Sequence, residues 1–207
     1  MTALAGPDAV ERAPETTPIT AAVAAAVRAL DPDAALPAYV YDLDHLGAHV
    51  AGVRAALVEA GAPVELLHAV KANPDPRALG VIADHVHGLE VASGGELDHV
   101  RTHLPHVPLA FGGPGKTDAE LAAALAAGVR RYHVESRYEL RRLDAAARTA
   151  GRVARVLLRV NPPVGAPEHR SAALTMGGVP SPFGMDPAEA AAAAGDLPDL
   201  AGIEVTG

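Results

Sequence analysis

From Pro37 onward the sequence repeats one pattern, in which a short apolar or β-branched run is followed by a turn and an Ala- and Leu-rich stretch of helical period. Helical stretches of about 10 to 18 residues can return the chain so that the next strand lies parallel to the last. The pattern predicts strands over 38–42, 64–70, 88–93, 108–113, 131–136, 153–160 and 201–207. Repeated βα units favour a parallel sheet, either an open doubly wound sheet or a (β/α)8 barrel.

The turns that follow the strands favour the barrel. An open dinucleotide-binding sheet is expected to carry G-x-G-x-x-G after its first strand, and no such turn follows residues 38–42 or 64–70. Polar residues and glycines instead follow several strands, in "KAN", "SGGE", "GGPGK", "ES" and "RVNP". Barrel enzymes assemble their sites from the carboxyl ends of many strands. We therefore expect an α/β fold of the (β/α)8 TIM-barrel type, with a site at this end.

The number of strands predicts an incomplete barrel. Six βα-type strands follow the extended segment at 38–42, whereas a closed barrel needs eight. We expect residues 37–207 to form a barrel that is truncated after about six strands, and its two open edges predict that the chain aggregates readily. Several prolines precede this region, so 1–36 is expected to be an N-terminal extension, partly disordered, with a short helix near 19–30.

Composition argues against several classes of function. Asp and Glu number 25 against 17 Lys and Arg, and this net charge of -8 disfavours a nucleic-acid partner. The chain has no cysteine, which excludes thiolate metal sites and cysteine nucleophiles within it. No apolar stretch reaches the ~18 residues of a membrane span, and no signal peptide is recognised, so we expect a cytoplasmic protein without a membrane partner. His99 and His103 have i, i+4 spacing, but no third ligand accompanies them, and no metal site is expected.

One lysine stands out because it follows an apolar run. In "LLHAVKANPDP", strand alternation would place Lys71 on the same face as Leu67 and Ala69, and would place His68 on the other face, where it is expected to pack. A lysine amine that is freed of its proton can form an imine with an aldehyde, which suits covalent catalysis. The alternative is a strand-end lysine that extends into solvent. Spacing alone does not decide between the two.

Five blocks of the sequence together resemble one family. They read "AVKANPDPRAL", "LEVASGGELDHV", "LAFGGPGKTDAELAAALAAGV", "YHVESRYELRRL" and "VLLRVNP". In order and spacing they closely resemble the fold-type III pyridoxal-phosphate-dependent decarboxylases, a group that contains the ornithine, arginine and diaminopimelate decarboxylases. The resemblance implies an alanine racemase-like barrel, pyridoxal 5'-phosphate as cofactor, an amino-acid substrate, a homodimer, and decarboxylation as the reaction.

The resemblance also assigns roles to individual residues. Lys71 matches the lysine that carries the cofactor through an imine, and it is the implied catalytic residue. Glu90 stands where the family more often has an aspartate near the cofactor, and Arg159 matches an arginine beside the cofactor. Ser93 and Glu96 match a turn whose shape they hold.

The block "GGPGKT" superficially resembles a phosphate-binding P-loop. It lacks the first glycine of that motif, because Ala110 stands at the required position. Lys116 and Thr117 are instead expected to open the next helix, with Thr117 as its cap.

The segment 161–186 is long and rich in Pro and Gly, which predicts a lid over the site. The family has a mobile loop here, followed by a "KFG"-type sequence that in this chain is "SPFGMD", with Pro182 in place of the lysine. The preceding "LTMGGVPS" is more similar to the branch that serves siderophore and antibiotic pathways. That likeness would imply an amino acid built into a larger or carrier-linked substrate.

Three functions stay open at this point. A decarboxylase is favoured over an amino-acid racemase of the same fold, because racemases usually follow the lysine with "ADAYG" and this chain has "ANPDP". A non-catalytic pyridoxal-phosphate-binding protein is third, since small proteins of that kind lack the "GGPGKT" block. Relatives continue past "GIEVTG" into further cofactor-binding residues and a C-terminal β-domain, so the resemblance implies an N-terminal fragment that is inactive alone.

Overall fold

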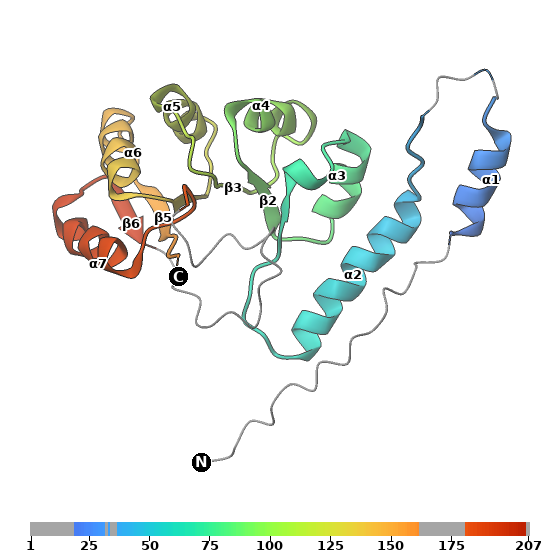
Figure 1. The fold of residues 1–207 in the computed structure, drawn as a ribbon, viewed down its shortest axis with the longest axis horizontal. Coiled ribbons are helices and arrows are strands. Elements are labelled where there is room, and N and C mark those ends of the chain that lie inside the picture. Colours follow the sequence, from blue (N-terminus) through green and yellow to red (C-terminus); the bar gives the residue numbers. More distant parts are fainter. Residues whose placement is uncertain (1–18, 32, 34–36, 162–180, 206–207) are drawn as a thin grey trace, which may run out of the picture. The chain divides into compact units, whose positions relative to one another are not determined.

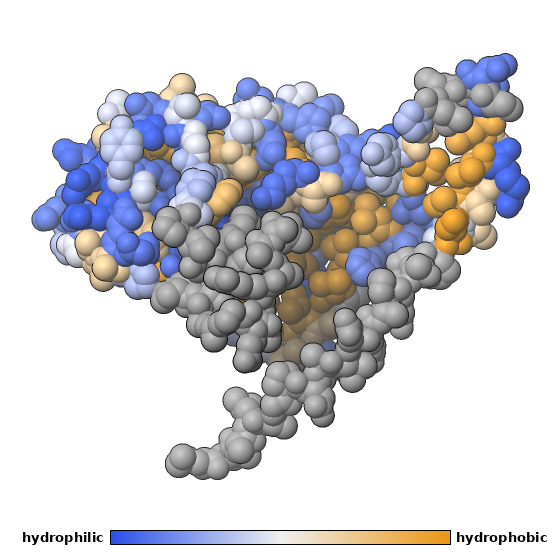
Figure 2. Space-filling view, in the orientation of Figure 1, coloured by the Kyte–Doolittle hydropathy of each residue, from blue (hydrophilic) through white to orange (hydrophobic). Residues whose placement is uncertain are grey.

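The computed structural model describes residues 19–31, 33, 37–161 and 181–205, and the chain divides into two compact units, Met1–His45 and Leu46–Gly207. In the first unit, helix α1 (Ala21–Ala29) begins at Thr20, whose hydroxyl oxygen accepts a hydrogen bond from the Val23 N–H. The same hydroxyl donates to Asp42 Oδ2 at 2.6 Å. The start of α1 is therefore tied to the segment that precedes the next helix. Most of the visible surface of α1 is hydrophobic (Figure 2).

The prediction of a strand over 38–42 is wrong. These residues have no strand partner among the described residues, and a strand needs a ladder of hydrogen bonds as well as an alternating pattern. Tyr39 and Tyr41 lie on one side of this segment, with ring centroids 6.3 Å apart, and both are exposed. The apolar and β-branched composition that suggested a strand is present, but the segment does not join the sheet.

The second unit contains a six-stranded parallel sheet in which each strand pairs with the next one in the sequence. Its strands are β1 (Leu67–Ala69), β2 (Gly88–Val91), β3 (Leu109–Phe111), β4 (Arg131–Val134), β5 (Ala154–Leu158) and β6 (Ile203–Val205). A doubly wound sheet reverses its strand order part-way, whereas a barrel adds strands in sequence. The sequential order confirms the predicted partial barrel, and each strand is shorter than predicted.

Helices connect the strands and lie along the outside of the sheet, where Figure 1 shows α3 to α6 in one row. The helices of this region are α2 (Leu43–Glu59), α3 (Pro76–Ala83), α4 (Gly94–His103), α5 (Asp118–Ala126), α6 (Arg137–Thr149) and α7 (Pro187–Asp196), with short 3-10 turns η1 (Val70–Ala72) and η3 (Leu197–Asp199). The visible surface over α4, α5 and α6 is mostly hydrophilic (Figure 2). The buried apolar side chains of these three helices therefore face the strands.

Side-chain caps start the helices close to the strand ends. The capping residues of α3 to α7 are Asp75, Ser93, Thr117, Ser136 and Asp186. Thr117 and Glu120 form a reciprocal capping box, which confirms Thr117 as a helix cap. Ser93 Oγ accepts from the Glu96 N–H, and Glu96 Oε2 accepts from the Ala92 N–H, so these two residues hold the turn after β2 as expected. Because α3 to α6 each begin within a few residues of the preceding strand, the connecting residues stay at the carboxyl edge of the sheet.

Strand alternation gives the sheet two different faces. One face packs against the helices and carries the buried side chains Leu89, Val91, Leu109, Phe111, Tyr132, Val134 and Val156. His68 is level with Leu89 on this face, as predicted, and burial lowers the pKa of its imidazole. The register aligns Ala69 with Glu90, and His133 with Leu157, on the opposite face. The face that carries Glu90 and His133 corresponds to the interior of a barrel.

A buried ion pair links β3 and β4 to α6. The Lys116 side chain is 0% exposed, and its Nζ donates to Glu139 Oε1 at 2.5 Å. The same ammonium donates to the carbonyl oxygens of Gly113 at 2.6 Å and His133 at 2.8 Å. All three donors of the ammonium are therefore used inside the protein. Lys116 is not the lysine of a phosphate-binding loop.

We expect Lys116→Met to lower the free energy of unfolding by about 3–5 kcal/mol, because it leaves the Glu139 carboxylate buried without its cation. Urea unfolding followed by circular dichroism measures this loss. Arg142→Met is the matched control on α6, since it breaks a pair with Asp118, whose side chain is 84% exposed. That control should cost only about 0–1 kcal/mol. Equal losses in the two variants would contradict the assignment.

Candidate active site

A cavity of about 710 Å³ opens at the carboxyl ends of the strands, on the face that carries Glu90 and His133. Its wall is formed by Lys71, Glu90, Ala92, Gly113, Pro114, His133, Leu157, Leu158, Arg159 and Phe183. The structure thus brings together the three residues that the sequence singled out, from the ends of β1, β2 and β5. Of the predicted lid at 161–186, residues 162–180 lie outside the described part of the chain.

Lys71 lies beyond the strand rather than within it. Strand β1 ends at Ala69, and Lys71 occupies the 3-10 turn η1, so the expected strand-face position is corrected. The turn is closed by a hydrogen bond from the Asn73 N–H to the Val70 carbonyl. Leaving the strand exposes the side chain, and the amine lies at the cavity instead of in a core. No buried cation needs explaining, because the turn places the lysine in an open site.

The segment after Lys71 is held at several points. The Asn73 side chain accepts a hydrogen bond from the Asp75 N–H, and Asp75 caps α3. His99 Nε2 lies 2.8 Å from the Pro74 carbonyl oxygen, which ties the segment to α4. His99 thus has a structural contact, and the described residues contain no group of three or more His, Asp or Glu side chains that could hold a metal ion.

Glu90 contacts His133 across the end of β3. Glu90 Oε1 lies 3.4 Å from His133 Nδ1, although the two residues belong to strands that are not neighbours. The position between them is Gly112, where an added Cβ would collide with the Glu90 carboxylate. The missing side chain of Gly112 therefore leaves the space through which Glu90 reaches His133.

The charges around Glu90 favour its ionised form. Contact with His133 is the largest cause that lowers the pKa of the carboxyl from its ordinary value of 4.5, and the cations of Lys71 and Arg159 add to it. Partial burial acts in the opposite direction and is outweighed. Glu90 is consequently the anionic member of a cavity that is also lined by the basic side chains of Lys71 and Arg159.

Arg159 is held from two sides. Its Nη1 donates to Glu135 Oε1 at 3.0 Å, and its guanidinium carbon lies 5.1 Å from the centre of the Phe183 ring. The side chain of Arg159 remains 35% exposed, whereas that of Glu135 is 2% exposed. The arginine is therefore fixed and still accessible from the cavity.

Reasoning from the sequence missed three residues that shape this site, namely Gly112, His133 and Glu135. His133 could have been found from strand parity, because it shares the inward face with Glu90 once the register is known. Gly112 and Glu135 lie in the strand-end blocks "GGPGK" and "ES", but their individual roles could not be assigned from the sequence, since each acts through a residue on another strand.

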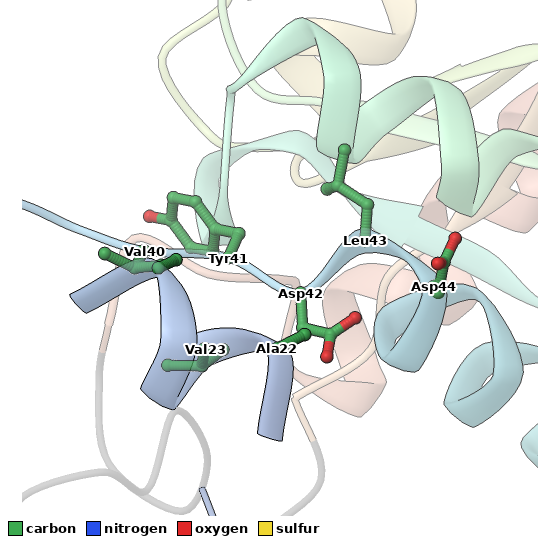
Figure 3. Close-up of a pocket in the computed structure, with 8 residues that line it drawn as sticks. Ala22, Val23, Val40, Tyr41, Asp42, Leu43 and Asp44 are labelled. Atoms are coloured by element: carbon green, nitrogen blue, oxygen red, sulfur yellow. The ribbon is translucent and has the colours of Figure 1, made fainter. Parts of the chain in front are cut away.

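A smaller cavity lies within Met1–His45, where α1 meets residues 40–44 (Figure 3). Its volume is about 300 Å³, and it is lined by Ala22, Val23, Ala26, Val40, Tyr41, Asp42, Leu43 and Asp44. The Asp42 carboxylate already accepts hydrogen bonds from Thr20 and from the His45 N–H. This lining contains neither a cation nor an amine nucleophile, so the larger cavity is the candidate active site.

Residues 44–207 match the family model described as the pyridoxal-binding domain of pyridoxal-dependent decarboxylases. The chain belongs to the pyridoxal-dependent decarboxylases. In this family, a decarboxylase of 2-[(L-alanin-3-ylcarbamoyl)methyl]-2-hydroxybutanedioate from Staphylococcus aureus is 40% identical over 147 residues, which are 71% of this chain and 35% of that protein. Diaminopimelate decarboxylase from Pseudomonas aeruginosa is 37% identical, over 83% of this chain and 40% of that enzyme.

A third relative is the L-glutamyl-[BtrI acyl-carrier protein] decarboxylase of Niallia circulans, which is 34% identical over 72% of this chain and 34% of its own length. Among solved structures, diaminopimelate decarboxylase from Helicobacter pylori complexed with L-lysine gives a TM-score of 0.66 at 26% identity, over 83% of this chain and 43% of that chain. The chain thus spans 34% to 40% of the length of these three curated relatives.

The residues of the cavity fit the cofactor that the family name implies. The exposed Lys71 can offer a primary amine to an aldehyde, while Glu90 and Arg159 supply one charge of each sign. Leu157, Leu158 and Phe183 add apolar surface against which a flat ring can pack. The cavity volume of about 710 Å³ also lies within the usual range for a small-molecule site.

Gly112→Ala should lower the free energy of unfolding by no more than about 1 kcal/mol, because the new methyl group displaces the carboxylate at the end of the flexible Glu90 side chain and breaks its partly exposed contact with His133. Gly115→Ala is the matched control, since a Cβ there meets nothing within 4 Å. In a Glu90→Ala background the cost of Gly112→Ala should largely disappear. Urea unfolding of the four variants measures these terms, and an unchanged cost in the Glu90→Ala background would show that the collision lies elsewhere.

The contribution of Glu90 to stability should depend on pH in a defined direction. Its folded-state pKa is lowered, so the contribution is fully present above its ordinary value of 4.5 and is lost as the pH falls through the lower folded-state value. The stability difference between the wild type and Glu90→Gln should therefore shrink below about pH 4.5. Urea unfolding across this range tests the prediction, with Asp98→Asn on the exposed side of α4 as control. A difference that grows as the pH falls would contradict it.

Proposed function

We propose that this chain is the cofactor-binding part of a pyridoxal-phosphate-dependent enzyme that decarboxylates an amino acid, and that Lys71 holds the cofactor covalently. The observation that carries this proposal is the position of Lys71, whose exposed side chain lies on the wall of a cavity that also contains Glu90 and Arg159. The sequence has one other lysine, Lys116, whose ammonium is fully buried and bonded to three oxygens. Lys71 is thus the accessible lysine of the chain.

Four further residues of the cavity would contribute through their charges or apolar surfaces. Once bound, the cofactor supplies an electron sink for the carbanion that remains when carbon dioxide leaves. Glu90, kept ionised by His133 and the nearby cations, would stabilise positive charge in the cavity. Arg159 would bind an anionic group with the donors that Glu135 does not use. Leu157 and Phe183 would exclude water from one side and strengthen these electrostatic contacts.

We infer that the substrate is an amino acid attached to a larger molecule rather than free diaminopimelate. Support comes from the relatives named for a carbamoyl-linked alanine derivative and for a glutamyl group on an acyl-carrier protein. It agrees with the expectation drawn from "LTMGGVPS" (174–181), of which residues 174–180 lie outside the described part of the chain. Diaminopimelate decarboxylases are also among the relatives and are the competing choice.

The homodimer and the cytoplasmic location stay predictions. They rest on the family resemblance and on the composition of the chain. Within the described ranges, the structure contains no helix with the length and hydrophobicity that crossing a membrane requires.

Borohydride reduction in the presence of pyridoxal phosphate, followed by peptide mapping, should place the label on Lys71. With two lysines in the sequence, the competing amines are Lys116 and the N-terminus. Lys71→Ala should abolish the specific label, whereas Lys116 should stay unlabelled in the folded wild type because its amine is buried. A label on Lys116, or one that persists in Lys71→Ala, would overturn the assignment.

A further inference from the structure

Glu135 is a buried carboxylate that contacts two sides of the candidate active site. Its Oε1 accepts hydrogen bonds from the Gly113 N–H at 3.1 Å and from Arg159 Nη1 at 3.0 Å. Its Oε2 accepts from the Gly184 N–H at 2.7 Å. Gly113 and Arg159 line the cavity, and Gly184 follows Phe183, which also lines it. One carboxylate that follows β4 therefore joins parts of the wall that follow β3 and β5.

The backbone around Glu135 is itself fixed by the buried ion pair. The Glu135 N–H donates to Glu139 Oε2 at 3.0 Å, while Glu139 Oε1 holds Lys116. Both polar backbone groups of Gly113 are engaged by this arrangement, the carbonyl by Lys116 and the N–H by Glu135. Two ion pairs thus share one backbone residue, so the Glu135 carboxylate has little freedom to move.

Gly184 adds a second constraint beside Arg159. It has a φ of 76°, and an added Cβ would lie 3.0 Å from the Arg159 carbonyl oxygen. The Met185 N–H also donates to that carbonyl at 2.8 Å, and Val160 forms a parallel bridge with Met185. The backbone of Arg159 is therefore clamped by the residues that follow Gly184. Its guanidinium is oriented by the Glu135 carboxylate on one edge and by the Phe183 ring.

We propose that Glu135 is a positioning residue which sets the orientation of the Arg159 guanidinium and thereby the affinity of the cavity for pyridoxal phosphate. This inference deepens the proposed function and rests on it. Arginine offers five N–H donors in a rigid plane, so fixing one edge on a carboxylate determines where the other donors point. Without that carboxylate, the guanidinium would turn to other acceptors, of which Glu90 is the charged one in the same cavity.

Titration with pyridoxal phosphate, followed by absorbance, tests the proposal. Glu135→Gln keeps the shape of the side chain and removes its charge, and should weaken cofactor affinity roughly ten-fold or more, as expected when an orienting partner is lost. Asp196→Asn is the matched control because it breaks the pair with Arg137, and neither residue lines the cavity. That control should stay within about two-fold of the wild type. Glu135→Asp retains the charge on a shorter side chain, and its cofactor affinity should lie between those of Glu135→Gln and the control. This variant replaces Glu135→Gln in the test if the glutamine variant does not fold.

A double-variant cycle separates positioning from a purely structural role. If Glu135 acts through Arg159, Glu135→Gln should change the affinity less than about two-fold in an Arg159→Met background. If the effects of the two substitutions multiply independently, Glu135 acts by another route and the proposal is wrong.

A second readout needs no cofactor. Modification of Arg159 by phenylglyoxal, mapped by mass spectrometry, should proceed several-fold faster in Glu135→Gln than in the wild type or in Asp196→Asn, because the guanidinium loses its fixed partner. Equal rates in all three proteins would overturn the proposal. If the wild type binds no pyridoxal phosphate, the proposed function fails, while the modification rates still decide the role of Glu135.

Discussion

The buried contact between Lys116 and Glu139 holds the carboxyl ends of β3 and β4 in place, and the cavity depends on it. Short parallel strands end in backbone groups that the sheet does not pair, and here a charged network binds several of them. The network is expensive to bury and stabilises the fold only when every member is present. The network also binds Gly113, and it therefore gives the wall of the cavity a rigid support.

The two lysines of the chain have opposite environments, and this contrast carries the functional argument. Lys116 follows the glycine turn after β3, and its buried ammonium donates hydrogen bonds to three oxygens. Lys71 follows β1 in a 3-10 turn that ends the strand early and leaves its side chain exposed. Composition alone cannot distinguish them. The local backbone decides which amine is available for chemistry and which one is a structural ion.

Much of the fold could be predicted from the sequence, because periodicity gives the order of strands and helices and six of the predicted strands exist. The segment 38–42 shows the limit, since its apolar and β-branched run pairs with no strand in the described part of the chain. Motifs led to Lys71, Glu90 and Arg159, which share one cavity. Residues such as Glu135 could not be predicted, because their importance comes from contacts across strands whose register the sequence does not state.

The absence of a side chain at Gly112 makes room for the long side chain of Glu90. Glu90 reaches His133 because the neighbouring strand end carries no Cβ. An aspartate at position 90 would be one methylene shorter and would leave the imidazole without its carboxylate. Glutamate at 90, glycine at 112 and histidine at 133 therefore form a unit that should be inherited together. Relatives that differ at one of these positions are expected to differ at the others.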